Sequence, residues 1–466
     1  MRYASLEDLP PYNPLERPAD RIKWVISLVT LTPIMGGSPN ARQIDDVDFV
    51  RAPSIRGQLR FWWRALYAGQ ATDSGDLYRR EREIWGGLGG KPNEVTASQV
   101  RVSVELDRNA ASKVEAEITK ALPQTAYALW PSGVPSEQDP APRRAAGLQF
   151  SLCIELPSSL AEQVQRTIRA FILFGGVGGR TRRGCGAVAP ATEADRQDWL
   201  PESMTPETLA KFLSPEPRHH GNVSSVHGAR YQIGTKQVEA QAAWYSAIDW
   251  LREFRQGCNK RTRDVADAGS FARMRPVVGP GAAGRPGRSR WPEADKIRQH
   301  YGPQSFDHQP LTGHGPQVVW PRAQFGLPIQ FQFQRRERPG SPRYPQEPPP
   351  NVMLVWSPDG NPDKASDRLA SALILKPVAL RSGEFVPLAL WLHRDLPNTA
   401  KVGIQRKSTD KISLKVGSTA PLQAVRASSD AELFLPISGH NSVSDAFMTW
   451  VGSLPGVKEV GVGGTL

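Results

Sequence analysis

The clearest alternation of apolar and polar positions lies over residues 22–30. One side of an extended chain there would carry Ile22, Trp24, Ile26, Leu28 and Thr30. A period of two is typical of a strand with one well-buried face. Similar alternation predicts two further strands, over residues 100–106 and 148–156.

A helical period follows the first predicted strand. Ser54 is well placed to cap this helix. The apolar face of the helix would carry Ile55, Leu59, Trp62 and Leu66, which are separated by four, three and four residues. That spacing indicates an amphipathic helix with one buried stripe.

A second stripe on the same predicted helix is basic. Arg56, Arg60 and Arg64 recur every four residues, so they share a face that must meet solvent, acidic groups or phosphate. An ordinary solvated face is one interpretation. The aromatic rings of the same stretch favour the other, because unpaired bases and phosphates together require rings beside guanidinium groups. Some of these rings must lie in the core, and Trp62 is the first candidate for that position. Trp63 is the candidate for stacking on an RNA base.

The order of predicted elements suggests the fold. A second helix over residues 160–174 and a short strand over 185–188 complete a strand, helix, strand, strand, helix, strand series within residues 20–190. This is the split βαβ plan of a ferredoxin-like domain, so we expect an α+β protein. Residues 191–227 are predicted to be a connector. A second domain, residues 228–466, should hold a helix over 238–256 and strands within 317–333, 369–380 and 384–392.

Composition narrows the class of partner. The 466-residue chain has a formal net charge of +12 and an isoelectric point near 9.7, which favours a polyanion. No apolar run approaches the roughly 20 residues that span a bilayer, so we expect a cytoplasmic protein without a membrane partner. Three widely spaced cysteines suit neither a disulfide framework nor a CxxC zinc site. No metal or other cofactor is predicted.

Residues 175–186 form the second basic signature. They contain six glycines and three arginines, Arg180, Arg182 and Arg183. The segment lacks the Gly-Lys-Ser/Thr of a Walker A loop, and its glycine spacing breaks the dinucleotide fingerprint after Gly178. Two interpretations of this segment remain. In the first, the loop brings backbone N–H groups and guanidinium groups to an RNA backbone. In the second, it is a tight turn whose arginines are only solvated.

Two other segments carry charge. Residues 251–290 hold ten Lys or Arg and three Asp or Glu, a basic stretch that could clasp nucleic acid or face an acidic subunit. Asp45, Asp46 and Asp48 could bind Mg²⁺ or act as acid and base, although a solvated, turn-forming loop is the commoner outcome for such a cluster. The alternative function that they support is a metal-dependent ribonuclease.

These segments together resemble the RAMP superfamily, and within it the family of first-numbered Cmr subunits of type III-B CRISPR effector complexes. The resemblance covers about residues 22–395, and it differs at Cys185, where the family usually has an aromatic residue. The motifs that carry it lie at residues 31–37, 51–64, 174–186, 287–293, 321–329 and 368–377.

The resemblance implies two ferredoxin-like (RRM-like) domains with long insertions, the second elaborated. It also implies a non-catalytic subunit of an antiviral ribonucleoprotein, placed near the 3′ end of the guide RNA, where it helps to capture target RNA. Guide RNA, target RNA and other Cmr subunits would be its partners. From the sequence pattern and the resemblance together, we expect these residues to bind RNA: Arg56, Arg60, Trp63, Arg64, Gly178, Gly179, Arg180, Arg182, Arg183, Arg288 and Arg290.

Overall fold

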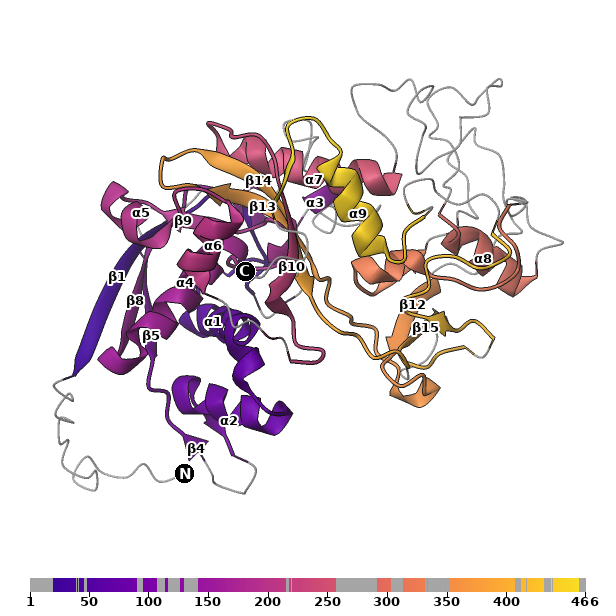
Figure 1. Cartoon of the computed structure of the whole chain (residues 1–466), viewed down its shortest axis with the longest axis horizontal. Coiled ribbons are helices and arrows are strands. Elements are labelled where there is room, and N and C mark those ends of the chain that lie inside the picture. The colour runs from indigo at the N-terminus through magenta and orange to yellow at the C-terminus, as the bar shows by residue number, and fades with distance from the viewer. Residues whose placement is uncertain are drawn as a thin grey trace.

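The computed structural model shows a mixed helix and strand protein, as expected, whose long elements form several small sheets (Figure 1). No helix in the described part is long and apolar enough to cross a membrane. The structure describes residues 20–38, 40, 42–45, 48–89, 95–106, 114–115, 126–129, 141–214, 218, 220–256, 291–302, 313–331, 333, 348, 352–406, 412–415, 417–430, 437 and 439–460.

The first sheet has the order β5-β8-β1-β9, with every neighbouring pair antiparallel. Ile26 lies opposite Leu152 and Leu28 opposite Phe150, so the apolar alternation of the two strands coincides on one face. Along the chain, the elements of this unit are β1 (Arg21–Thr30), α1 (Ala52–Tyr67), β5 (Arg101–Leu106), β8 (Gln149–Pro157), α4 (Ala161–Phe174) and β9 (Val188–Pro190).

The second sheet repeats this arrangement with the order β13-β14-β10-β17. Each of its neighbouring pairs is again antiparallel. Its elements are β10 (Ser225–Ile233), α7 (Ala240–Gln256), β13 (Leu373–Ala379), β14 (Phe385–His393), α9 (Val443–Gly452) and β17 (Lys458–Val460).

A third sheet, of order β11-β12-β15-β16, interrupts the second unit. It has a core of its own, which includes Trp320, Leu354 and Ile404 and is joined by Ile297 of a short helix. The elements are α8 (Glu293–Tyr301), β11 (Ile329–Phe331), β12 (Val352–Ser357), β15 (Lys401–Arg406) and β16 (Ala420–Pro421).

The long elements stack in layers (Figure 1). Helices α1 and α4 cover one face of the first sheet, and their other sides contact β10 and β13 of the second. One continuous core therefore includes Ile26, Trp62, Ile168 and Ile374. The opposite face of the second sheet packs on α7 and α9, where Leu375, Trp244 and Phe447 meet.

Lys376 lies inside the layer shared by the two sheets. The Lys376 side chain is fully buried, and its Nζ donates to the carbonyl oxygens of Gly175 at 2.8 Å and Ile172 at 3.1 Å. These carbonyls end α4, where the helix dipole is negative and intrahelical donors are lacking. Burial lowers the pKa of Lys376 to about 7. Strand β13 thus caps α4 with an ammonium group that has little water around it.

The smaller elements complete the first unit. A helix α2 (Ser74–Trp85) packs on α1, and a short sheet joins β2, β7 and β6. Their bounds, with the remaining elements, are β2 (Ile34–Met35), β3 (Gly87–Leu88), β4 (Val95–Thr96), β6 (Val114–Glu115), α3 (Ala126–Leu129), β7 (Arg143–Arg144), α5 (Glu193–Trp199) and α6 (Pro206–Leu213).

Most long elements confirm the pattern analysis, and three details differ. The helix of the Arg stripe begins at Ala52 and not after Ser54, because Pro53 occupies its first turn. The closing strand begins at Val188, after the loop, and not at Cys185. The predicted connector contains α5 and α6, whose residues Trp199 and Leu209 join the first core.

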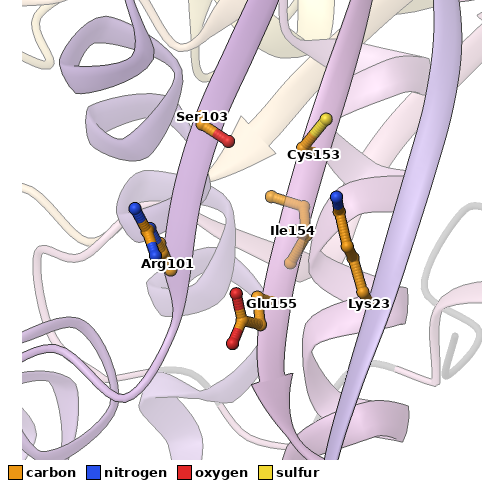
Figure 2. A pocket seen from close by; sticks show the side chains of 6 residues that line it. All are labelled: Lys23, Arg101, Ser103, Cys153, Ile154 and Glu155. Atoms are coloured by element: carbon orange, nitrogen blue, oxygen red, sulfur yellow. The ribbon is translucent and has the colours of Figure 1, made fainter. Parts of the chain in front are cut away.

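The outer face of the first sheet, turned away from α1 and α4, carries mainly polar and charged side chains, several of which Figure 2 labels. A hollow of about 220 Å³ lies there, lined by Lys23, Arg101, Ser103, Cys153 and Glu155 among others. Cys153 therefore lies on this outer face and not in the core between sheet and helices. The outward residues of the described strands β1, β5 and β8 include no aromatic, so this face lacks the stacking platform of an RRM.

Candidate nucleic-acid interface

The Arg stripe of α1 faces α2 and is partly neutralised there. Arg60 Nε lies 2.6 Å from Glu81 Oε1, and Arg64 donates to the same oxygen. The Glu81 side chain is only 4% exposed, whereas the two arginines are about a third exposed. Arg56 donates to the carbonyl oxygen of Trp85 at the end of α2. The stripe joins two helices, and its binding of RNA stays a proposal.

We expect Glu81→Ala to lower the free energy of unfolding by about 1–3 kcal/mol, because it leaves two half-buried guanidinium groups without their carboxylate. Urea denaturation measures this loss. Glu83→Ala is the matched control on the same helix, since Glu83 and its partner Arg79 are each 53% exposed and such pairs contribute about 0–1 kcal/mol. Equal losses in the two variants would contradict a structural role for the Glu81 pairs.

The aromatic residues of α1 are placed differently from the prediction. Trp63 is 2% exposed and lies against Tyr67, so a base cannot stack on its indole, and the assignment of Trp63 as a stacking residue is wrong. Trp62 is core, as expected. Phe61 remains partly exposed, packs edge-on against Trp62, and has the Arg182 guanidinium 5.5 Å from its ring centre.

The Gly/Arg loop, residues 175–186, is held by backbone hydrogen bonds to its own unit. The N–H of Val177 donates to Gly186, that of Gly186 to Pro33, and that of Gly179 to Met35, at 2.6 to 2.9 Å. The amide groups predicted to reach phosphate are therefore bonded to the protein at these positions.

Close packing explains two of the loop's glycines. A Cβ at Gly178, whose φ is +78°, would lie 2.6 Å from Ile34 Cγ2 and 2.8 Å from the Met35 carbonyl oxygen. At Gly186, with φ +61°, it would lie 1.9 Å from the Val177 carbonyl oxygen. Only glycine fits such positions. At Gly179 a Cβ would lie 3.2 Å from the Met35 oxygen. An RNA contact of Gly178 and Gly179 stays a proposal.

The three loop arginines are the structure's most distinctive charges. Arg180 is exposed, has left-handed backbone geometry, and its Nε donates to the Ala128 carbonyl at 2.6 Å. Arg183 donates to the Leu373 carbonyl of β13 at 3.0 Å. One terminal nitrogen of Arg182 is buried without any hydrogen-bond partner. Burial lowers the pKa of Arg182 to about 10, with repulsion from Arg394 contributing, and that of Arg183 to about 9.

No described carboxylate forms an ion pair with these three arginines. Apart from Tyr127, the titratable groups that influence the pKa of Arg183 are Arg180, Arg182 and Arg255, which are all cationic. This contrasts with Arg60 and Arg64, which share Glu81. Guanidinium groups that are desolvated and lack an anion form a ready site for phosphate oxygens. Within the described residues, the loop arginines therefore lack the neutralising carboxylate that Arg60 and Arg64 of the α1 stripe share.

The loop also joins the two larger sheets. The turn Thr181–Arg183 lies on β13, and Trp244 Nε1 of α7 donates to the Arg183 carbonyl at 2.7 Å. Arg394, which follows β14, is close enough to repel Arg182. The sequence analysis did not identify Arg394 as a site residue, because a single arginine after an apolar strand has no distinguishing pattern.

The acidic loop around Asp45 is held by hydrogen bonds to its own carboxylate. Asp45 Oδ1 accepts the backbone N–H of Asp48 at 2.8 Å, and Oδ2 accepts from Arg51. Asp46 lies outside the described residues. Within the described ranges, no three His, Cys, Asp or Glu side chains are grouped as metal ligands. This geometry is that of a turn-forming cluster.

Two predicted RNA-binding residues, Arg288 and Arg290, lie outside the described ranges, as does most of the basic segment 251–290. His314 is buried, with Nδ1 3.0 Å from Asp295 Oδ2, in the interior beside α8. Cys185 is also buried, and its Sγ lies 3.6 Å from Met35 Sδ, where the thiol fills the space between loop and β2.

Comparison with known proteins finds one family and several structures. The family model of the RAMP superfamily matches residues 27–189. The crystal structure of Cmr1 from Pyrococcus furiosus in its apo form is 14% identical, with 94% of this chain and 98% of that chain covered and a TM-score of 0.47. A chain of the type III-B Cmr-beta complex bound to cognate target RNA is 12% identical, with 80% and 95% covered and a TM-score of 0.42. No curated protein matches.

Proposed function

We propose that this chain, whose residues 27–189 match the RAMP-superfamily model, is a non-catalytic RNA-binding and assembly subunit of a type III-B CRISPR effector complex. Its partners are guide RNA, target RNA and other Cmr subunits. Its place is near the 3′ end of the guide, where it helps to capture target RNA in the cytoplasm. The RAMP match and the sequence motifs at residues 31–37, 51–64 and 174–186 support the class.

The observation that carries RNA binding is the uncompensated arginine cluster of the loop. Arg180, Arg182 and Arg183 have no carboxylate partner in the described chain, and one nitrogen of Arg182 is buried without a hydrogen bond. Buried donors without partners are costly, and a phosphate would satisfy them. The formal charge of +12 would attract the polyanion over a longer range.

The strand orders support two ferredoxin-like domains. Numbered within each unit, both large sheets have the order 2-3-1-4, and each unit runs strand, helix, strand, strand, helix, strand. We assign residues 20–190 to the first domain and 228–466 to the second, with the third sheet as the elaboration. Helices α5 and α6 of residues 191–227 pack on the first domain.

A non-catalytic role fits the engaged carboxylate of Asp45. Both of its oxygens accept hydrogen bonds from the loop's own residues, so this carboxylate holds the turn. Cleavage of single-stranded RNA by the isolated chain with Mg²⁺ or Mn²⁺, lost on Asp45→Ala, would overturn this part of the proposal.

The experiment begins with the tagged full chain, purified gently from its native host. We expect a large particle that contains short RNAs of uniform length with CRISPR-spacer sequence. In that particle, Arg182→Gln should weaken binding of complementary target RNA about fivefold and reduce the slope of log K against log salt by about one, because one phosphate contact is lost.

Arg79→Gln is the matched control, since Arg79 is an exposed arginine of α2 that is already paired with Asp76 and Glu83. It should leave both the affinity and the salt slope unchanged. Thermal unfolding of both variants shows whether they stay folded. A lone protein without RNA, or equal behaviour of Arg182→Gln and wild type, would contradict the proposed function or the role of the loop, respectively.

A further inference from the structure

A second concave site lies where the second and third sheets meet. Its volume is about 660 Å³, within the range of small-molecule and nucleotide sites. Residues from three distant segments line it: Gly221 and Asn222 before β10, Arg394 to Asn398 after β14, and Gln423 after β16. The N–H of Asp395 donates to the Gly221 carbonyl at 3.3 Å, which ties two of these segments together.

The lining is unusually rich in groups that read base edges. Asn222, Asn398 and Gln423 contribute amides, and Asp395 contributes a carboxylate that lies 3.3 Å from His393 Nε2. The side chains of Asn222 and Asn398 make no hydrogen bond within the described chain. Amide groups offer both donors and acceptors, so they suit the mixed pattern of a base edge.

A positive charge lies at one side of this pocket. Arg394 donates to the Ala370 carbonyl at 3.2 Å, while its Nε is buried without a partner. No described carboxylate forms an ion pair with Arg394, whose Nε is buried without a hydrogen bond. A phosphate oxygen at Arg394 would satisfy this buried donor.

We propose that this pocket is an RNA subsite that receives one unpaired nucleotide, with its phosphate at Arg394 and its base against Asn222, Asn398 and Gln423. The inference rests on the proposed function and deepens it, because it continues the path of the RNA from the Gly/Arg loop onto the second domain. An unpaired base is required, since a duplex hides the edges that the amides read.

Photo-crosslinking tests the location in the RNA-containing particle. Ultraviolet irradiation of the particle with bound single-stranded target RNA, followed by digestion and mass spectrometry, should give nucleotide adducts on peptides that contain residues 221–222 or 394–398. Crosslinks that fall elsewhere, with none on these peptides, would overturn the pocket and leave the proposed function standing.

Two variants then separate base from phosphate. Asn222→Ala/Asn398→Ala should weaken binding of the same single-stranded RNA about fivefold with an unchanged salt slope, because it removes only uncharged contacts. Arg394→Gln should weaken binding by a similar factor and lower the salt slope by about one. The control, Arg368→Gln, changes an arginine whose side chain is 87% exposed, and should have no effect.

The outcomes distinguish the two proposals. Wild-type binding by both pocket variants, together with weakened binding by Arg182→Gln, would remove the pocket and keep the loop as an RNA site. A wild-type protein that neither carries nor binds RNA would remove the proposed function and the pocket with it.

Discussion

Gly186→Ala should lower the free energy of unfolding by about 3–5 kcal/mol, one of the largest effects expected of a single methyl group in this protein. The added Cβ would lie 1.9 Å from the Val177 carbonyl oxygen, which belongs to the backbone and cannot rotate away. The positive φ of +61° adds about 1–2 kcal/mol of strain for any residue with a Cβ. Urea denaturation measures the total.

Gly36→Ala is the control for the backbone strain alone. Gly36 has nearly the same φ, +68°, but a Cβ there would find nothing within 4 Å. We expect it to cost only the strain, about 1–2 kcal/mol. If the two substitutions cost the same, the loop relaxes around the methyl group, and the close approach of Gly186 to Val177 does not constrain it.

Lys376→Met should remove a rise of stability with pH that the wild-type protein shows above neutrality. The folded pKa of Lys376 is about 7, below its ordinary value of 10.5. Between these two pH values the unfolded chain binds a proton that the folded chain does not, so the contribution of Lys376 to stability increases as the pH rises. The slope approaches about 1.4 kcal/mol per pH unit.

The measurement is the unfolding free energy of wild type minus that of Lys376→Met, at about pH 7, 8 and 9. This difference should grow with pH, because both proteins share every other titrating group. Lys236→Met provides the control, since the Lys236 side chain is 55% exposed and pairs with Glu384 on the surface. A difference that stays flat would show that Lys376 remains protonated between the two sheets, held by the carbonyls of α4.

The long elements of the first unit could be predicted because their side-chain periods are regular. The alternation over residues 22–30 and the stripe of Ile55, Leu59 and Trp62 each correspond to one buried face of β1 and α1. The third sheet was missed, apart from a strand near residue 329, because its strands are short and separated by long insertions. Helix α9 was missed as well, although Ser442 caps it with a hydrogen bond to the Asp445 N–H.

The site could be predicted only in part, because the sequence does not show which arginines pair with a carboxylate in the fold and which do not. Sequence spacing shows which charges share a helix face, but not which acidic group that face meets. Glu81, on another helix, neutralises Arg60 and Arg64, whereas no carboxylate among the described residues pairs with Arg182. The burial of Trp63 could not be predicted for a similar reason. A helix between two sheets buries side chains on more than one face, whereas the apolar period indicates only the face of Ile55, Leu59 and Trp62.

The placement of α1 and α4 between two sheets has a consequence during synthesis. These helices have apolar surface on two sides, and the second sheet that covers one of them is completed only after β14 emerges. Between the release of Phe174 and that of His393, the ribosome works for roughly 10 to 40 s. The nascent first unit lacks the second sheet as a cover for that surface throughout this interval. Truncation before β10 would leave the exposure permanent and favour aggregation.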